Sequence, residues 1–280
     1  MTARETGFRA IHFAAMIILG IILIFPLLYL VTSSFKSNFE IFGSIRIFPQ
    51  EILFDGFING WRGVGGVGFG QFLTNTFRLV IPTVTFTVLS CLIVGYGFSR
   101  FDFPLKRFLF VTMLSLMMLP STVTIIPRYL LFARFGWIDT YYPFWVPSML
   151  ATSSFFIFMF IQFFRSLPRE LDEAATIDGC GSFTTLVFVL IPLCIPAIMA
   201  AAIFTFLWTW NDFFSQFLFI SSLRNFTVAL GLRVSIDAAH AIVWRNILAM
   251  SLVSMLPSAL VFLFLQRFFI QGIATSGLKG

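Results

Sequence analysis

Histidine, cysteine and charged residues are all scarce in this sequence. Its 280 residues include two histidines and three cysteines, and only 11% of the residues are charged. Cys91, Cys180 and Cys194 are too few and too far apart for a disulfide framework or a Cys-x-x-Cys metal site. His12 and His240 are equally isolated, so no catalytic or metal-ligating cluster can be assembled, and the composition argues against a membrane-embedded enzyme.

Apolar residues are correspondingly abundant, at 59% of the chain with 40 phenylalanines. A soluble domain carries about a quarter charged residues, and a water-soluble fold of this size could not hide so much apolar surface. The formal net charge of +6 is scattered as single and paired cations, which does not indicate nucleic-acid binding. We therefore predict an integral membrane protein whose surface contacts membrane lipid.

Six apolar runs are long enough to cross a bilayer as helices, which takes about 20 residues. The first run exceeds the 7–15-residue core of a signal peptide, so we expect it to be retained. The fold class predicted is an all-α polytopic membrane protein, a single transmembrane domain over residues 1–280. The runs cover approximately residues 11–33, 71–98, 108–127, 142–164, 191–220 and 246–266.

Proline and glycine mark the irregular places. Membrane helices tolerate proline where neighbouring helices or water satisfy the backbone, so these residues suit a bundle that lines a path, although structural kinks explain them equally well. Residues 63–68, Gly-Val-Gly-Gly-Val-Gly, predict a flexible, exposed linker, and no Lys-Ser/Thr follows to make a phosphate loop. The prolines within runs are Pro26, Pro82, Pro120, Pro127, Pro196 and Pro257.

The connector after the fourth run predicts a short amphipathic helix over about residues 168–178. Pro168 suits a first helical position, the acidic residues that follow suit the positive end of the helix dipole, and Gly179 suits a left-handed C-terminal residue. This helix is either a surface element that joins two spans or a docking element for another protein. Its acidic residues are Glu170, Asp172 and Glu173, and its small or apolar face is Leu167, Leu171, Ala174 and Ala175.

This connector resembles the cytoplasmic motif of ATP-binding-cassette (ABC) importer permeases. That pattern is Glu-Ala-Ala, three residues, Gly, nine residues, Ile-x-Leu-Pro. The chain has Glu173-Ala174-Ala175, then Gly179, then Val189-Leu190-Ile191-Pro192 at the same spacing, with two substitutions that are conservative in volume.

Other segments are similar to the carbohydrate, maltose-type branch of these binding-protein-dependent permeases. They are Asp178-Gly179, Pro192-Leu193 with Pro196, Trp210-Asn211-Asp212 and Gly277-Leu278-Lys279-Gly280. The resemblance covers nearly the whole chain. It implies that the chain is the permease subunit of an importer for a sugar or oligosaccharide.

The resemblance also implies location and partners. The segments predicted on the side of the N-terminus carry nine lysines and arginines, and those on the opposite side carry eight. This difference leaves the orientation open. The motif, however, implies a bacterial inner-membrane protein with both termini cytoplasmic. Its partners would be a second permease subunit, an ATPase dimer that holds ATP and Mg²⁺, and an extracytoplasmic solute-binding protein. No cofactor is expected in this chain.

For the coupling site, the resemblance implies that the short helix sits in a cleft of the ATPase. Ala174, Ala175 and Gly179 would make the close contact, and Glu173 and Asp178 would make polar contacts. Pro192 completes the motif at the start of the fifth run.

Ionisable residues inside spans are rare and usually functional, and two stand out. Arg78 and Asp212 both lie about seven residues from the predicted outer end of their runs, about 10 Å deep at 1.5 Å per residue. Either they form an ion pair or they face one aqueous path. Trp210 and Asn211 adjoin Asp212 and suit sugar binding, whereas Trp208 suits a membrane anchor.

Two alternatives remain at this stage. Amino-acid or peptide import is the nearer one, and Trp210-Asn211-Asp212 disfavours it. An ion-coupled secondary transporter would need repeated halves and an acidic relay near the midplane. The sequence shows no internal repeat, and Asp212 is its one acid within a run.

Overall fold

The computed structural model describes residues 3–237 and 243–276, and the regular elements in these ranges are helices. The chain divides into two compact units, Met1–Gln71 with Gly231–Leu256 and Phe72–Leu230 with Pro257–Gly280. The all-α fold class is therefore confirmed, whereas the single domain over residues 1–280 stays a prediction.

Four helical segments in the described ranges are long and apolar enough to cross a membrane, and two bent pairs raise the possible number to six. Each overlaps one of the six predicted runs. The four are His12–Ser33, Phe69–Arg100, Tyr142–Ser166 and Trp244–Gln266. The pairs are Lys106–Met117 with Thr122–Arg134, bent by 105°, and Ser182–Leu193 with Ile195–Asn211, bent by 78°.

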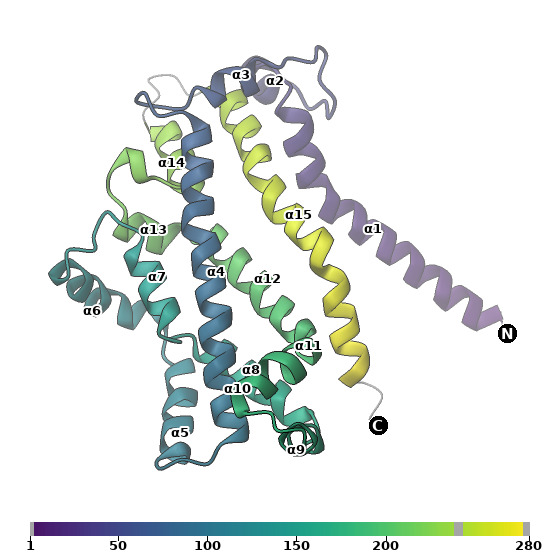
Figure 1. Ribbon diagram of the computed structural model, residues 1–280. Coiled ribbons are helices and arrows are strands. Elements are labelled where there is room, and N and C mark those ends of the chain that lie inside the picture. Colours follow the sequence, from purple (N-terminus) through teal and green to yellow (C-terminus); the bar gives the residue numbers. More distant parts are fainter. Residues whose placement is uncertain (1–2, 238–242, 277–280) are drawn as a thin grey trace. The chain divides into compact units, whose positions relative to one another are not determined.

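The first unit contains the N-terminal helix and the connector that follows it (Figure 1). The apolar side chains of the first span are exposed along its length, as expected of a helix surrounded by lipid. After this span, Phe35 packs against Phe54 and Phe57 with ring centroids 5.5 and 5.2 Å apart. The helices of this unit are α1 (Ala3–Ser33), α2 (Asn38–Gly43), α3 (Asp55–Trp61), the end of α14 (Val228–Asp237) and the start of α15 (Trp244–Ser276).

The glycine-rich stretch of this connector is non-helical, as predicted, and contains a tight turn that the prediction of a linker did not specify. Val64 and Val67 exchange two backbone hydrogen bonds of 3.0 Å, and Gly65 and Gly66 between them have φ values of 58° and 79°. Positive φ at both central residues is the geometry of a type I′ turn, which glycine adopts without steric cost. A Cβ on Gly63 would lie 1.9 Å from the Val67 carbonyl oxygen, so this turn also needs its flanking glycine.

The second unit packs its helices around two apolar clusters. The larger one lies among α4, α5, α8 and the start of the fifth span, with Phe156, Phe160 and Phe164 fully buried. Its helices are α4 (Phe69–Arg100), α5 (Lys106–Met117), α6 (Ser121–Arg134), α7 (Tyr142–Met149), α8 (Ser154–Ser166), α9 (Glu170–Ile177), α10 (Ser182–Thr184), the π-helix η1 (Thr185–Leu190), α11 (Ile191–Leu193), α12 (Ile195–Asn211), α13 (Phe213–Phe219) and the 3₁₀ helix η2 (Leu223–Asn225).

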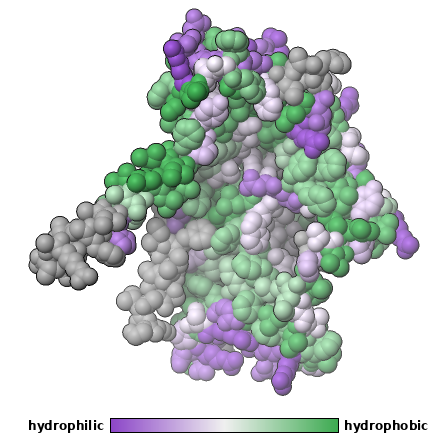
Figure 2. Space-filling model, turned by 180° about the vertical axis from the view of Figure 1, so that it is seen from behind, coloured by the Kyte–Doolittle hydropathy of each residue, from purple (hydrophilic) through white to green (hydrophobic). Residues whose placement is uncertain are grey.

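Hydrophilic residues gather at the lower end of this unit, where α5 and α9 lie, and hydrophobic residues cover the surface above them (Figure 2). This division is what a bundle embedded in lipid requires, because polar groups are stable only outside the hydrocarbon region. The short helix α9 belongs to this polar end.

Candidate functional site

The connector helix α9 forms where the sequence predicts it, after the end of α8 and before the start of η1. Its first turn contains Glu170, Asp172 and Glu173. At the other end Gly179 has a φ of +80°. The Cys180 N–H donates to the Ala175 carbonyl (2.9 Å) and the Gly179 N–H donates to the Thr176 carbonyl (3.0 Å). This pair of bonds is a Schellman motif, so the C-terminus of the helix is closed by its own backbone.

The predicted coupling residues do not all face outward. Ala175 is 5% exposed, because it packs against its own chain. Ala174, Glu173, Asp178 and Gly179 are exposed. A Cβ on Gly179 would meet no atom within 4 Å. Among the predicted coupling residues, the surface available to a partner is therefore one small side chain, two carboxylates and an open glycine, and Ile177 beside them is 85% exposed.

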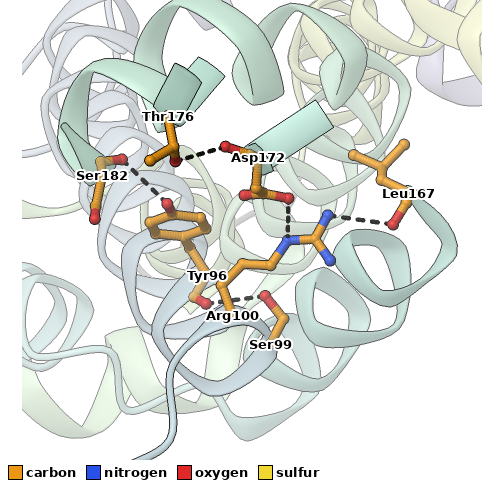
Figure 3. Close-up of polar contacts among 7 residues, drawn as sticks. All are labelled: Tyr96, Ser99, Arg100, Leu167, Asp172, Thr176 and Ser182. Carbon is orange, nitrogen blue, oxygen red and sulfur yellow. Dashed lines mark hydrogen bonds and ion pairs between the residues drawn. The ribbon is translucent and has the colours of Figure 1, made fainter. Parts of the chain in front are cut away.

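An ion pair fixes α9 to the end of α4 (Figure 3). Arg100 Nε lies 3.0 Å from Asp172 Oδ2, and the two side chains are 7% and 25% exposed. This contact is electrostatic, since neither atom has an aligned hydrogen bond. The Arg100 guanidinium also donates to the Leu167 carbonyl at 3.2 Å. One arginine thus connects α4 both to α9 and to the segment that precedes it.

A second contact lies beside the first. The Tyr96 hydroxyl, one turn earlier on α4, donates to the Ser182 carbonyl at 3.1 Å. Figure 3 shows the tyrosine pointing at Ser182 and the arginine at Asp172, so the two side chains hold both ends of the α9 segment. The Glu-Ala-Ala pattern gave no signal for either, because Tyr96 and Arg100 lie more than 70 residues earlier in the chain.

The fifth span begins with an irregular helix. Residues Thr185–Leu190 are a π-helix. At Cys194 the chain bends once, by 78°, between the segments Ser182–Leu193 and Ile195–Asn211. Pro192 and Pro196 flank this bend, and each removes a backbone donor and crowds the preceding turn. Pro192 is exposed. The predicted motif residue therefore lies at a bend between α9 and the rest of the span.

The candidates at the C-terminal end of this span lie in three different environments. Trp210 is 6% exposed and packs against Phe77 and Phe206, with ring centroids 5.2 and 5.3 Å apart. The Asn211 amide is exposed and donates to the Leu207 carbonyl of its own helix. Asp212, with ψ of 90°, ends α12 and caps α13 by accepting the Ser215 N–H at 3.0 Å. The span predicted as one run over residues 191–220 is thus interrupted at Asp212, because the carboxylate satisfies the next helix's N-terminus.

Arg78 is exposed on α4, beside Phe77, Tyr141 and Trp145. Within the described ranges no ion pair joins it to Asp212, so the predicted pair is not formed in this structure. The charge of Asp212 instead acts on Arg128 of α6. The predicted third run ends at about residue 127, whereas α6 continues to Arg134 and includes Arg128.

Trp208 is 52% exposed and its ring lies 5.5 and 5.3 Å from those of Phe155 and Phe156. An exposed tryptophan with one packed face is typical of a membrane-facing residue. Its role as an anchor stays a prediction.

Asp139 joins the connectors that follow α6 and α13. Its carboxylate accepts the Ser221 and Ser222 N–H groups at 3.0 and 2.8 Å and the Ser222 hydroxyl at 3.0 Å. The Asn225 amide donates to its carbonyl at 2.8 Å. Burial alone would raise the pKa of Asp139, but the hydrogen bonds that its ionised carboxylate accepts from Ser221 and Ser222 hold the pKa below its usual value.

The part of the chain that the structure describes contains no metal-binding cluster, because no three His, Cys, Asp or Glu side chains converge there. Cys91 and Cys194 are buried, and Cys180 is half-buried at the end of α9.

Comparison with known proteins points to one family. The family model described as "Binding-protein-dependent transport system inner membrane component" matches residues 87–274. The probable ABC transporter permease protein YurM of Bacillus subtilis is 31% identical over 256 residues, which are 91% of this chain and 84% of that protein.

Other relatives cover similar lengths. The arabinooligosaccharides transport system permease protein AraQ of Halalkalibacterium halodurans is 30% identical, over 94% of this chain and 93% of its own. The sn-glycerol-3-phosphate transport system permease protein UgpE of Brucella melitensis is also 30% identical, over 92% and 93%. Among solved structures, a bacterial ABC transporter involved in the import of the acidic polysaccharide alginate has a chain with a TM-score of 0.87. It is 18% identical and covers 96% of this chain and 99% of that one, so it supports the fold.

Proposed function

Because this chain belongs to the family of binding-protein-dependent transport system inner membrane components, we propose that it carries a sugar or oligosaccharide through the membrane as part of an ABC importer. It is a transport permease subunit and not an enzyme. The relatives AraQ, UgpE and the diacetylchitobiose uptake permease NgcG of Streptomyces coelicolor support a carbohydrate-like substrate. Family membership also disfavours an ion-coupled secondary transporter.

The family fixes part of the assembly. A binding-protein-dependent ABC transporter works with a solute-binding protein and an ATPase, and this chain is its multi-pass inner-membrane component. We assign it a second, different permease subunit and two ATPase copies, which hold the ATP and Mg²⁺. The chain's termini and α9 are assigned to the cytoplasm, where the ATPase is.

One observation carries the coupling proposal: α9 is a helix with a closed C-terminus and an exposed face, and it is tied to a span. Its Schellman end and the Arg100–Asp172 pair leave it little freedom to move alone. A partner that grips Glu173, Ala174, Asp178 and Gly179 therefore moves α4 with it. Packed elements of this kind shift between discrete arrangements and do not deform continuously.

The transport cycle follows from this connection. ATP binding closes the two ATPase copies and displaces α9. The displacement reaches α4 through Arg100 and Tyr96, and it reaches the fifth span through η1 and the bend at Pro192 and Pro196. The bundle then opens alternately to the binding protein and to the cytoplasm.

A site-specific crosslink tests the coupling assignment. Glu173→Cys, in a chain that also carries Cys180→Ser, is labelled with a short photoreactive maleimide in the assembled transporter. We expect a crosslink to the ATPase subunit, and none from Arg62→Cys, an equally exposed position in the outer connector. An intact complex that gives no ATPase crosslink from Glu173→Cys contradicts the docking of α9 and leaves the family assignment untouched.

The substrate class has a separate test. The cognate solute-binding protein is titrated calorimetrically with a panel of neutral and acidic sugars, amino acids and short peptides. Binding of a sugar or oligosaccharide with micromolar or better affinity supports the proposal. Binding of amino acids or peptides alone would identify the alternative importer class.

A further inference from the structure

Basic side chains line a cavity where α4 and α8 end and α5 begins. The cavity has a volume of about 690 Å³. Its four cations come from different parts of the chain, and one acid, Glu170, also lines it. The cations are Arg100, Lys106, Arg165 and Arg169.

Within the described ranges, two of these cations form ion pairs and two do not. Arg100 pairs with Asp172, and Lys106 pairs with Asp102 at 2.9 Å. Among the described residues Arg165 and Arg169 have no ion pair. The Arg165 guanidinium lies 5.5 Å from the centre of the Phe110 ring. With Glu170 as the remaining acid, the cavity keeps a surplus of positive charge.

An aromatic pocket adjoins the basic cavity and shares two of its cations. Lys106 and Arg165 line both, and the second pocket adds the rings of Phe98, Phe103 and Phe110 together with Arg107 and Asp102. The Phe98 ring lies 5.3 Å from that of Phe103 and 6.4 Å from that of Phe110. A ligand that fits both pockets needs an anionic group next to an apolar part.

The position of the two pockets identifies that ligand. Three spans end here, at Arg100, Lys106 and Ser166. Figure 2 shows the change from hydrophobic to hydrophilic surface at this end of the molecule. In a bilayer such a boundary falls at the lipid headgroups, where basic pockets between helices bind anionic lipids.

We propose that the cavity binds the phosphate group of an anionic phospholipid, whose acyl chain lies along Phe98, Phe103 and Phe110. The charge surplus favours phosphatidylglycerol over zwitterionic phosphatidylethanolamine. Arg100 and Arg169 also border α9, so the bound headgroup stabilises the junction through which α9 is held to α4. This site requires only that the chain is a membrane protein and does not depend on the sugar or on docking of the ATPase.

Native mass spectrometry of the assembled transporter tests the site. The transporter is extracted from nanodiscs of phosphatidylethanolamine with increasing phosphatidylglycerol, and retained lipid is counted. We expect retained phosphatidylglycerol for the wild type and about 30-fold weaker retention for Arg165→Gln/Arg169→Gln, because each cation near an anionic lipid contributes roughly a factor of five. Arg46→Gln/Arg62→Gln, which removes two exposed charges elsewhere, is the matched control and retains lipid like the wild type.

Three results would overturn the proposal: equal retention in the Arg165/Arg169 variant, equal retention of phosphatidylethanolamine by the wild type, or displacement of the lipid by millimolar inorganic phosphate, which would indicate a site for the free ion. If the double variant does not assemble, the single change Arg169→Gln at an exposed position is expected to weaken retention about fivefold. Arg165→Lys/Arg169→Lys keeps the charge and is expected to retain the lipid.

Discussion

The two ends of the fifth span are built differently. At its start, the connector around α9 closes its own backbone and is held by the Arg100–Asp172 ion pair and by hydrogen bonds from Arg100 and Tyr96, while four of the predicted coupling residues stay exposed. At its end, Trp210 is buried and Asp212 caps the next helix. The first end is built to present a surface, and the second is built mainly to join helices. Neighbouring residues therefore share a role where they lie on one exposed surface, as around α9. They need not share one where they lie in different environments, as at Trp210, Asn211 and Asp212.

The largest effect is expected at the first end. Asp172→Ala leaves Arg100 nearly buried without its partner, and we expect a loss of about 3 kcal/mol in stability together with loss of ATPase-coupled transport. Thermal unfolding and transport assays of the assembled transporter measure both. Asp102→Ala breaks the more exposed pair with Lys106 and should cost less than about 1 kcal/mol. Equal effects of the two changes would show that the Arg100–Asp172 pair is not special.

The stability of the two connectors that Asp139 joins should depend on pH. Its pKa is lowered in the folded state, so its stabilisation is complete above the ordinary aspartate value near 4 and is lost as pH falls through the lower, folded value. Asp139→Ala should remove about 2 kcal/mol at neutral pH. Unfolding measured between pH 3 and 7 should show a smaller acid dependence in Asp139→Asn than in the wild type. An unchanged dependence would exclude this carboxylate as its source.

Gly179→Ala tests whether the closed end of α9 matters. The left-handed backbone costs a residue with a Cβ about 1.5 kcal/mol, although no atom lies near enough to clash. We expect weaker association with the ATPase, measured by co-purification, and a larger loss for Gly179→Leu. Gly181→Ala, at a φ of −75° and with open space around it, is the control. A wild-type result for Gly179→Leu would rule out the role assigned to this glycine.

The smallest effect sharpens the contrast at the second end. Asp212→Ala removes a helix cap and should cost about 1 kcal/mol, whereas Asp212→Asn keeps a capping oxygen and should be nearly neutral in stability. Transport by Asp212→Asn then separates two roles. Wild-type transport indicates a cap alone, and lost transport in a stable protein assigns the carboxylate charge to the substrate path.

Much of the fold follows from local signals that the sequence contains in full. The apolar runs give the spans, and Gly179 with the acidic first turn gives both ends of α9. The rest depends on distant partners. Nothing near Arg100 indicates that Asp172 will neutralise it, and nothing near Asp212 indicates that Arg128 will lie within its electrostatic reach. The turn at Gly65-Gly66 was missed for a different reason, because glycine-rich composition describes a flexible linker and a type I′ turn equally well.

The distribution of thiols gives this protein a native reporter. Of its three cysteines, two are buried among spans, and Cys180 is half-buried, three residues past the end of α9. In an unmodified transporter, a fluorescent maleimide should therefore react with Cys180 before it reacts with the other two cysteines of this chain. The rate of this reaction, measured with and without nucleotide, would report how far Cys180 is covered at each stage of the cycle. This measurement needs no engineered residue.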